Sequence, residues 1–558
     1  PLLPYFLWKG GALSSFSTRH LNPKTLKGGT NGAGLMVYLT RKTTRGQQYW
    51  YLVNSFKFNG GVEKVQHYLG SEKPSEQELE RLKAIHEPEL ELAAARDIER
   101  ILLGRFLDLQ RHVAFGLAQQ PVAELGRLHP LRVGAETGQV GVEPDPAETA
   151  LVDQFGAQFG SLPGNAEVVK LRDRAIQAIK ENGLPTRRVE AWHYTDLRRL
   201  LATLPGYVPS GEAQDLERIV DAAARLVLRN GKVSATESVE QLTVNSMSDA
   251  LRADVSGVSM NDHGIHDATG LINSAFVTDG FVINVESGAK IAKPVEMQSL
   301  HDGGQVHVRN SVTIGEGASV TVFDRHAGSD TEVLETAVTE LKLRKGAEAL
   351  WVTIQETGDA ATHLSQMNVT LEEDAKLTLF IVNLSGKVIR QEINGDVVGE
   401  GADLTFRAVN LIGDDAHCDI TLSLGHLVPN TTSTETVRNV VTGKAQGVFQ
   451  GQIRVGRIAQ KTDAQMACNT LLLSDDAGFS TKPELEIFAD DVVCAHGATV
   501  AEIDEDHLFY LMARGISEKT ARGLLIKAFV TEIVEELENE PLIEALEARI
   551  DRWLEVHA

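Results

Sequence analysis

The chain has 558 residues, and its 77 acidic residues outnumber 54 Lys and Arg, giving a net charge of −23. A surface this acidic disfavours binding to nucleic acid over most of its length. No apolar run reaches the roughly 18 residues of a membrane span, and three cysteines are too few for a disulfide framework. The sequence therefore predicts a soluble, cytoplasmic protein with room for more than one domain.

The first 117 residues predict a small module without an assigned role. Residues 1–30 show no periodicity, and three alternating runs between 35 and 69 predict a three-stranded β-meander. The turn at Asn59-Gly60-Gly61 favours a hairpin. Residues 71–117 have helical spacing, and the Gly- and Pro-rich residues 118–146 are typical of a linker.

A second helical region is predicted over residues 147–227. Apolar spacing indicates helix over 147–182, and Gly183 with Pro185 marks its end. The following segment, GLPTRRVEAWHYTDLRRLL, is rich in polar and aromatic side chains. We interpret it as a packed, hydrogen-bonded junction between a helix and a loop in preference to an active site.

Residues 228–503 contain a repeat that predicts a parallel β-helix. A short phrase, seen as EGASVTV, KGAEALWV and EGADLTF, places an alanine at 289, 318, 347, 375 and 402. The steps are 29, 29, 28 and 27 residues. An even step of this size, with a turn followed by an alternating strand, indicates a solenoid. A β-sandwich also has many short strands, but it does not explain the even spacing.

The last region, residues 504–558, is predicted to be helical. Ser517 is suited to cap one helix, and Pro541 to begin another. The final helix carries an apolar stripe that is either core or a surface for a partner. The stripe consists of Leu542, Leu546, Ile550, Trp553 and Leu554.

Cys494 and His496 are the candidate metal ligands. In a strand, residues two apart point to the same face, so the thiol and the imidazole lie side by side. Iron or zinc usually takes about four ligands, and the chain has no CxxC motif to complete the set. The missing ligands are therefore expected from another chain. The alternative is that Cys494 is simply a small buried residue, as we expect for Cys468.

Three segments carry a resemblance to a known family: HLVPNTTSTETVRNVVTGKAQGVFQGQIRV, AQKTDAQMACNTLLLSDDAGFSTKPELEIFADDVVCAHGAT and DEDHLFYLMARGISEKTARGLLIKAF. They resemble the SufB/SufD family of iron–sulfur cluster assembly proteins. The segment GLPTRRVEAWHYTDL and the run CAHGAT favour its SufD branch. The resemblance covers residues 147–558, so residues 1–146 are expected to be a fused module or an upstream extension of the reading frame.

The resemblance implies a mainly β fold, a right-handed parallel β-helix between N-terminal and C-terminal helical domains. It implies a non-catalytic scaffold subunit that pairs with SufB through the edge of the β-helix and with the SufC ATPase through the C-terminal helices. Iron or a nascent cluster would be shared with the partner chain at Cys494 and His496. The residues expected to contact partners are Asp490, Asp491, Leu508, Phe509, Tyr510, Arg514, Gly515 and Phe529.

Two other functions stay open at this point. A β-helix can be a carbohydrate-active enzyme, although Asp414 and Asp415 are its nearest acidic pair and adjacent strand residues point apart. The chain can also be a purely structural partner that ligates no metal. No phosphate-binding loop, HExxH or GxSxG motif is present in the sequence.

Overall fold

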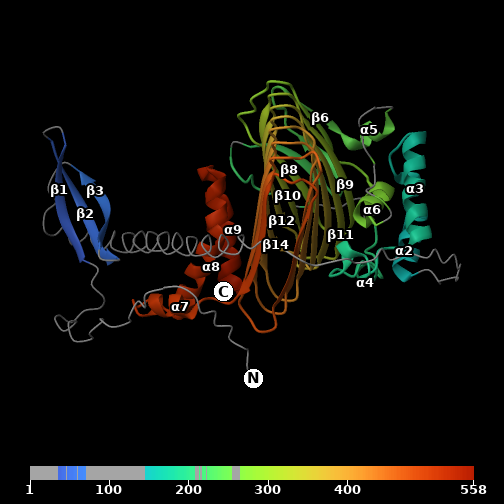
Figure 1. Ribbon diagram of the computed structural model, residues 1–558. Helices are drawn as coiled ribbons and strands as arrows, with labels where there is room; N and C mark the ends of the chain where they lie inside the picture. The colour runs from blue at the N-terminus through green and yellow to red at the C-terminus, as the bar shows by residue number, and fades with distance from the viewer. Residues whose placement is uncertain are drawn as a thin grey trace. The chain divides into compact units, whose positions relative to one another are not determined.

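The computed structural model describes residues 145–557, apart from 208–212, 214–215, 222, 254–259, 261–263 and 265, and the backbone of 36–44, 47–58 and 61–70 (Figure 1). The strands β1 (Met36–Thr44), β2 (Gln47–Phe58) and β3 (Gly61–Gly70) pair in antiparallel order, which confirms the predicted meander. The predicted tail at 1–30, the helices at 71–117 and nearly all of the linker lie outside the described residues.

The central part of the chain is a parallel β-solenoid built from two facing sheets, which confirms the predicted fold (Figure 1). Over residues 281–501 the strands alternate between the sheets, so each turn of the solenoid adds one strand to both, whereas the strands at 232–236 and 242–246 pair antiparallel with a neighbour. The first sheet consists of β4 (Ala224–Arg229), β5 (Lys232–Thr236), β8 (Val295–His301), β10 (Ser319–Gly328), β12 (Glu348–Glu356), β14 (Lys376–Ser385), β16 (Asp403–Ile412), β18 (Thr432–Val441), β20 (Asp463–Leu472) and β22 (Val493–Ala501). The second sheet consists of β6 (Leu242–Ser246), β7 (Phe281–Val285), β9 (Gly304–Ile314), β11 (Val333–Leu343), β13 (Ala361–Leu371), β15 (Val388–Val397), β17 (His417–His426), β19 (Gln446–Val455) and β21 (Gly478–Ile487).

The repeated alanines form one corner of the solenoid. All five are at most 1% exposed, and the carbonyl of each accepts a hydrogen bond from the backbone N–H that starts the strand of the next turn, as Ala318 does from Glu348. The residue before each alanine has a positive φ, for example 64° at Gly317 and 63° at Gly346, where glycine is favoured. The corner therefore needs one residue in the left-handed backbone conformation, followed by a residue with a small, buried side chain.

The same corner continues beyond residue 402, where the alanine phrase disappears from the sequence. Thr431 and Thr462 take the alanine position, and both are buried. Asn430 and Lys461 take the left-handed position, with φ of 58° and 64°. The repeat is therefore longer in space than its most recognisable sequence signal.

Apolar side chains from both sheets fill the lumen, which is the interior between them. Alternate residues of each strand point inward, as Val320 and Val322 do from β10, and Leu341 and Leu343 from β11. Many of the intervening residues point outward and pack against helices on either side of the solenoid, as Phe323 and Leu334 do. The lumen and the helices together thus bury much of both faces of each sheet, as is typical of parallel sheets.

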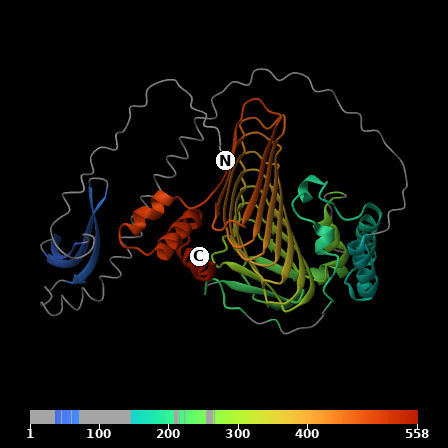
Figure 2. The ribbon, with the colours of Figure 1, turned by 90° about the horizontal axis from the view of Figure 1, so that it is seen from below.

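Helices cover the two sheets on opposite sides of the solenoid (Figure 2). Those against the second sheet are α2 (Pro146–Gln158), α3 (Ala166–Asn182), α4 (Leu197–Leu200), α5 (Met247–Arg252) and α6 (Ala268–Phe276). Those towards the C-terminus are α7 (Glu505–Met512), α8 (Glu518–Val534) and α9 (Glu540–His557). Among the helices that the structure describes, none is long and apolar enough to cross a lipid bilayer.

The apolar stripe of the last helix is part of the core. All five of its residues are buried, and with α8 they form a cluster against the outward side chains of the first sheet, such as Phe380 and Val409. Ser517 caps α8, because its hydroxyl accepts a hydrogen bond from the backbone N–H of Thr520 at 3.3 Å. Of the two interpretations left open by the sequence, the structure supports core packing.

The segment GLPTRRVEAWHYTDL fastens the N-terminal helices to the second sheet. Trp192 is 1% exposed, and the Arg390 guanidinium lies 3.9 Å from the centre of its ring. Arg390 pairs with Glu392 at 2.7 Å and with Asp419, and Thr195 also donates to Asp419. The segment is therefore a hydrogen-bonded junction, as interpreted from the sequence.

Candidate functional site

The last turn of the solenoid, which we call the terminal rung, consists of β21, β22 and the turn at 488–492. Within the described part of the chain, β22 pairs only with β20, and β21 only with β19, so each leaves one backbone edge unpaired. The rung also exposes large apolar side chains, including Phe488 at 54% and Val493 at 61%. An unpaired, partly apolar edge is a surface on which another chain can add its own strands.

Cys494 and His496 both lie on the inward face of β22. Cys494 is in register with Ala464, and His496 with Met466, and these two partners on β20 are buried in the lumen. Cys494 packs against the lumen core and is partly buried, whereas His496 is exposed. The structure thus places the thiol and the imidazole on one face at the open end of the solenoid.

The environment of Cys494 favours the protonated thiol. Burial raises its pKa, and the nearby Asp463 and Glu435 carboxylates raise it further. The backbone of Ala464 acts in the opposite direction through a hydrogen bond. A metal ion at this thiol would therefore have to displace a proton, because the thiolate is the form that binds metals.

Glu435 is a third polar group on the same inward face, and it was missed from the sequence. Its register neighbours are Phe406 on β16 and Met466 on β20, so it lies below Met466 in the column that ends at His496. It is 1% exposed, and neither carboxylate oxygen has a hydrogen-bond partner among the described residues. Burial raises its pKa to about 7, although the charge of Arg407 lowers it. The signal was available, because alternation in the segment TSTETV puts this acid at an inward position.

The other cysteines do not join the pair. Cys418 and Cys468 are both buried in the lumen, and burial raises the pKa of Cys468 to about 11. His417 points to the outside of the second sheet, where its ring lies 2.9 Å from the Thr195 hydroxyl. Cys468 is therefore the small buried residue that the sequence indicates.

The residues expected to contact partners fall into two groups. Asp490 and Asp491 are exposed on the turn of the terminal rung, and Asp491 pairs with Lys461. On α7, Phe509 is 72% exposed, whereas Leu508 packs inside the α7–α8 hairpin. Tyr510 is half-buried in the same hairpin, and Phe529 packs against the core below α8. Arg514 and Gly515 are exposed in the loop before α8.

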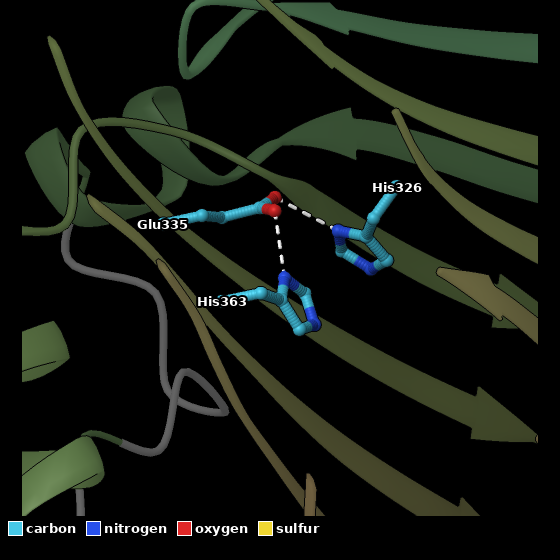
Figure 3. Close-up of side chains that lie close together, drawn as sticks. All are labelled: His326, Glu335 and His363. Atoms are coloured by element: carbon cyan, nitrogen blue, oxygen red, sulfur yellow. Dashed lines mark hydrogen bonds and ion pairs between the residues drawn. The ribbon is translucent and has the colours of Figure 1, made fainter. Parts of the chain in front are cut away.

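A second cluster lies inside the lumen, far along the chain from Cys494. Glu335 on β11 accepts hydrogen bonds from the Nδ1 atoms of two histidines, His326 on β10 at 2.8 Å and His363 on β13 at 2.7 Å (Figure 3). Burial raises the pKa of Glu335, but the charges of His326 and His363 outweigh it and hold this pKa well below its usual range. The only sequence signal for this cluster is that Glu335 and His363 are 28 residues apart, which is one step of the repeat.

Comparison with known proteins identifies the family of this chain. Residues 297–529 match the family model described as "SUF system FeS cluster assembly, SufBD core domain". The chain is 30% identical over 397 residues to the iron–sulfur cluster assembly protein SufD of Escherichia coli, a match that covers 68% of this chain and 91% of that protein.

Two further relatives extend the comparison. The chloroplastic protein ABCI7 of Arabidopsis thaliana is 26% identical, with 71% of this chain and 89% of that protein covered. The iron–sulfur cluster assembly protein SufB of Bacillus subtilis is 28% identical, with 49% and 60% covered. The fold is a β-solenoid with an open terminal rung. The chain belongs to the SufB/SufD family of iron–sulfur cluster assembly proteins.

Proposed function

We propose that this chain is a scaffold subunit, without turnover of its own, in which the terminal rung joins a SufB-type partner. The observation that carries the proposal is the placement of Cys494 and His496 on one face of an unpaired edge strand. Among the strands that the structure describes, both sheets end there with unpaired backbone groups, so a related solenoid can continue both sheets. The relatives described above include proteins named SufD and SufB, which is consistent with a pair of homologous subunits.

Iron or a nascent cluster is the cargo at this joint. A thiolate and a neutral imidazole suit ferrous iron, and two ligands from this chain leave room for ligands from the partner. Glu435 lies just inside the rung, with its carboxylate oxygens unpartnered within the part of the chain that the structure describes. It is therefore available as a further oxygen ligand or as a proton acceptor when the Cys494 thiol ionises.

The helices at 504–558 form the second docking surface, for an ATPase of the SufC type. Phe509 and Met512 on α7 are exposed apolar residues, 72% and 41%. ATP-driven closure of the ATPase would pull on the segment at 513–534 and rotate this chain against its partner. That rotation would open the joint and expose Cys494 and His496 to incoming iron.

The ligand role is tested on the complex co-expressed with SufB and SufC. We expect His496→Ala to leave the complex intact but to lower its iron and sulfide content after assembly. The matched control is His266→Ala, another exposed histidine, which lies just before α6. Equal iron and sulfide in the wild-type and His496→Ala complexes would remove the ligand role.

The docking surface is tested by co-purification. Phe509→Asp should abolish retention of SufC while SufB is retained, because it places a charge in an apolar contact. Val398→Asp is the control, since Val398 is an exposed apolar residue, at 40%, that directly follows β15 and lies outside the C-terminal helices. Retention of SufC by the Phe509→Asp variant would show that the ATPase docks elsewhere.

A further inference from the structure

The buried cluster around Glu335 joins the two sheets across the lumen. His326 belongs to the first sheet, whereas Glu335 and His363 belong to the second and are direct register partners. Ser299 on β8 also donates to Glu335 at 2.9 Å. Figure 3 shows both imidazoles turned towards the one carboxylate. The glutamate is therefore held from two strands of one sheet and from a neighbour in its own sheet.

A third histidine, His301 at the end of β8, completes the surroundings of Glu335. Its Nε2 atom is 3.7 Å from the Glu335 carboxylate, which is beyond hydrogen-bonding distance. Gly328 lies beside it in register, and a Cβ there would come within 2.1 Å of the His301 ring. A glycine at this position thus leaves the space that the imidazole fills.

Several nitrogen atoms of this cluster are buried without a hydrogen bond. Among the described residues, neither His301 nitrogen nor the Nε2 atom of His363 has a partner. The side chains of His301, Glu335 and His363 are all 0% exposed. A buried polar atom without a partner destabilises the fold, so the hydrogen bonds alone do not account for three imidazoles here.

The charges point to a cation. Asp324 lies 3.3 Å from the Nε2 atom of His326, so two buried carboxylates, Asp324 and Glu335, share this pocket with the histidines. Buried carboxylates are stable only when they are paired or coordinate a metal. Burial lowers the pKa of His326, but Glu335 and Asp324 outweigh it and raise this pKa well above its usual range, so a protonated imidazole balances the two carboxylates. A divalent ion can supply that positive charge in place of the proton, and it gives a partner to His301, whose nitrogens make no hydrogen bond to the described residues.

We propose that His301, His326, Glu335 and His363 bind a divalent first-row transition metal ion inside the lumen. Three imidazoles and a carboxylate suit Fe²⁺ or Zn²⁺, in contrast to the all-oxygen sites of Ca²⁺ and Mg²⁺. The ligand atoms of His326, Glu335 and His363 lie within 4.8 Å of one another. Ligands around a tetrahedral ion are about 3.3 Å apart, so small side-chain rotations complete the site.

In this arrangement the ion takes the place of the two N–H···O protons between Glu335 and the histidines. It is a site separate from Cys494 and His496, contains no sulfur ligand, and is independent of the function proposed above. Its location between strands of both sheets means that the bound ion links the sheets to each other. The metal would thus stabilise the early turns of the solenoid.

The corner turns beside the cluster offer a favourable approach for a cation. Three successive turns between the two sheets carry Asp302, Asp330 and Asp359. Burial and then the charge of Asp330 raise the pKa of Asp359, which is consistent with a negative potential at this corner. Such a group concentrates cations at the corner.

The test uses Co²⁺ as a probe, added to the full chain under anaerobic conditions until the absorbance is constant. We expect visible d–d bands for one ion at nitrogen and oxygen ligands, without a thiolate-to-cobalt charge-transfer band. Glu335→Gln should weaken Co²⁺ binding at least tenfold. The double variant Cys494→Ser/His496→Ala should bind as the wild type does, because it alters only the terminal rung.

A second variant separates ligation from folding. His301→Leu removes two nitrogens that make no hydrogen bond to the described residues, so the metal-free chain should melt at the same or a higher temperature. If His301 is a ligand, the variant also loses the rise in melting temperature that Zn²⁺ gives the wild type, and its Co²⁺ affinity falls at least tenfold. The proposal is overturned if the wild type shows no d–d bands, if Glu335→Gln or His301→Leu binds Co²⁺ unchanged, or if the double variant loses the bands.

Discussion

Replacing Glu435 by glutamine should stabilise the isolated chain at alkaline pH. The side chain is 1% exposed and burial raises its pKa from 4.5 to about 7, so ionising it inside the lumen is costly. At 1.36 kcal/mol per pKa unit, the shift corresponds to about 3 kcal/mol. Glutamine has nearly the same shape and stays neutral, so Glu435→Gln removes this cost.

The sign of the pH dependence follows from the raised pKa. Below about pH 4.5 the carboxyl is protonated in both states, and it costs nothing. Between 4.5 and about 7 the unfolded chain releases the proton while the folded chain keeps it, so wild-type stability falls as pH rises. Above about 7 the full cost of about 3 kcal/mol remains.

The assay compares melting temperatures of wild type and variant at pH 4.5 and pH 8. For a folded unit of this size, about 3 kcal/mol corresponds to a difference of about 4 °C. We expect this difference at pH 8 and almost none at pH 4.5, whereas Glu400→Gln, at an exposed turn, should show none at either pH. An equal difference at both pH values for Glu435→Gln would refute the buried, ionisable assignment.

Three further predictions concern the interfaces of the fold. Arg390→Ala should cost about 3–5 kcal/mol in the free energy of unfolding, measured by urea denaturation, because it leaves two buried carboxylates unpaired; a cost below 1 kcal/mol would contradict this. Leu546→Ala should cost about 2–5 kcal/mol in the same assay, since its side chain is 0% exposed beneath the first sheet, and a neutral result would place α9 outside the core. Phe488→Lys should change stability by less than about 0.5 kcal/mol but weaken co-purification with SufB, and unchanged co-purification would exclude this part of the rung from the joint.

The repeat is the part of the fold that the sequence predicts best. A buried alanine recurs because each corner has room only for a small side chain. This steric restriction makes the repeat period visible in the sequence. Thr431 and Thr462 meet the same demand with a different residue, and the signal fades there although the corner does not. The exact domain boundaries at 147–227, 228–503 and 504–558 stay predictions.

The buried polar groups were harder to predict for a physical reason. The repeat step indicates which residues stack within one sheet, as Glu335 and His363 do. It does not indicate which strands face each other across the lumen, so the approach of His326 to Glu335 was invisible. The pairing of Cys494 with His496 could be predicted because both residues belong to one strand, whereas Glu435 lies two strands away in the same sheet.

The left-handed residue and its small neighbour have a consequence for how this architecture can change over time. Successive copies of this pair are separated by 29, 29, 28, 27, 29 and 31 residues, yet every copy from Gly317 onward is followed directly by a strand of the first sheet. An insertion or deletion within one coil thus leaves the position of the next corner and the start of the next strand unchanged. Whole coils can therefore be duplicated or deleted during evolution without disturbing those that remain.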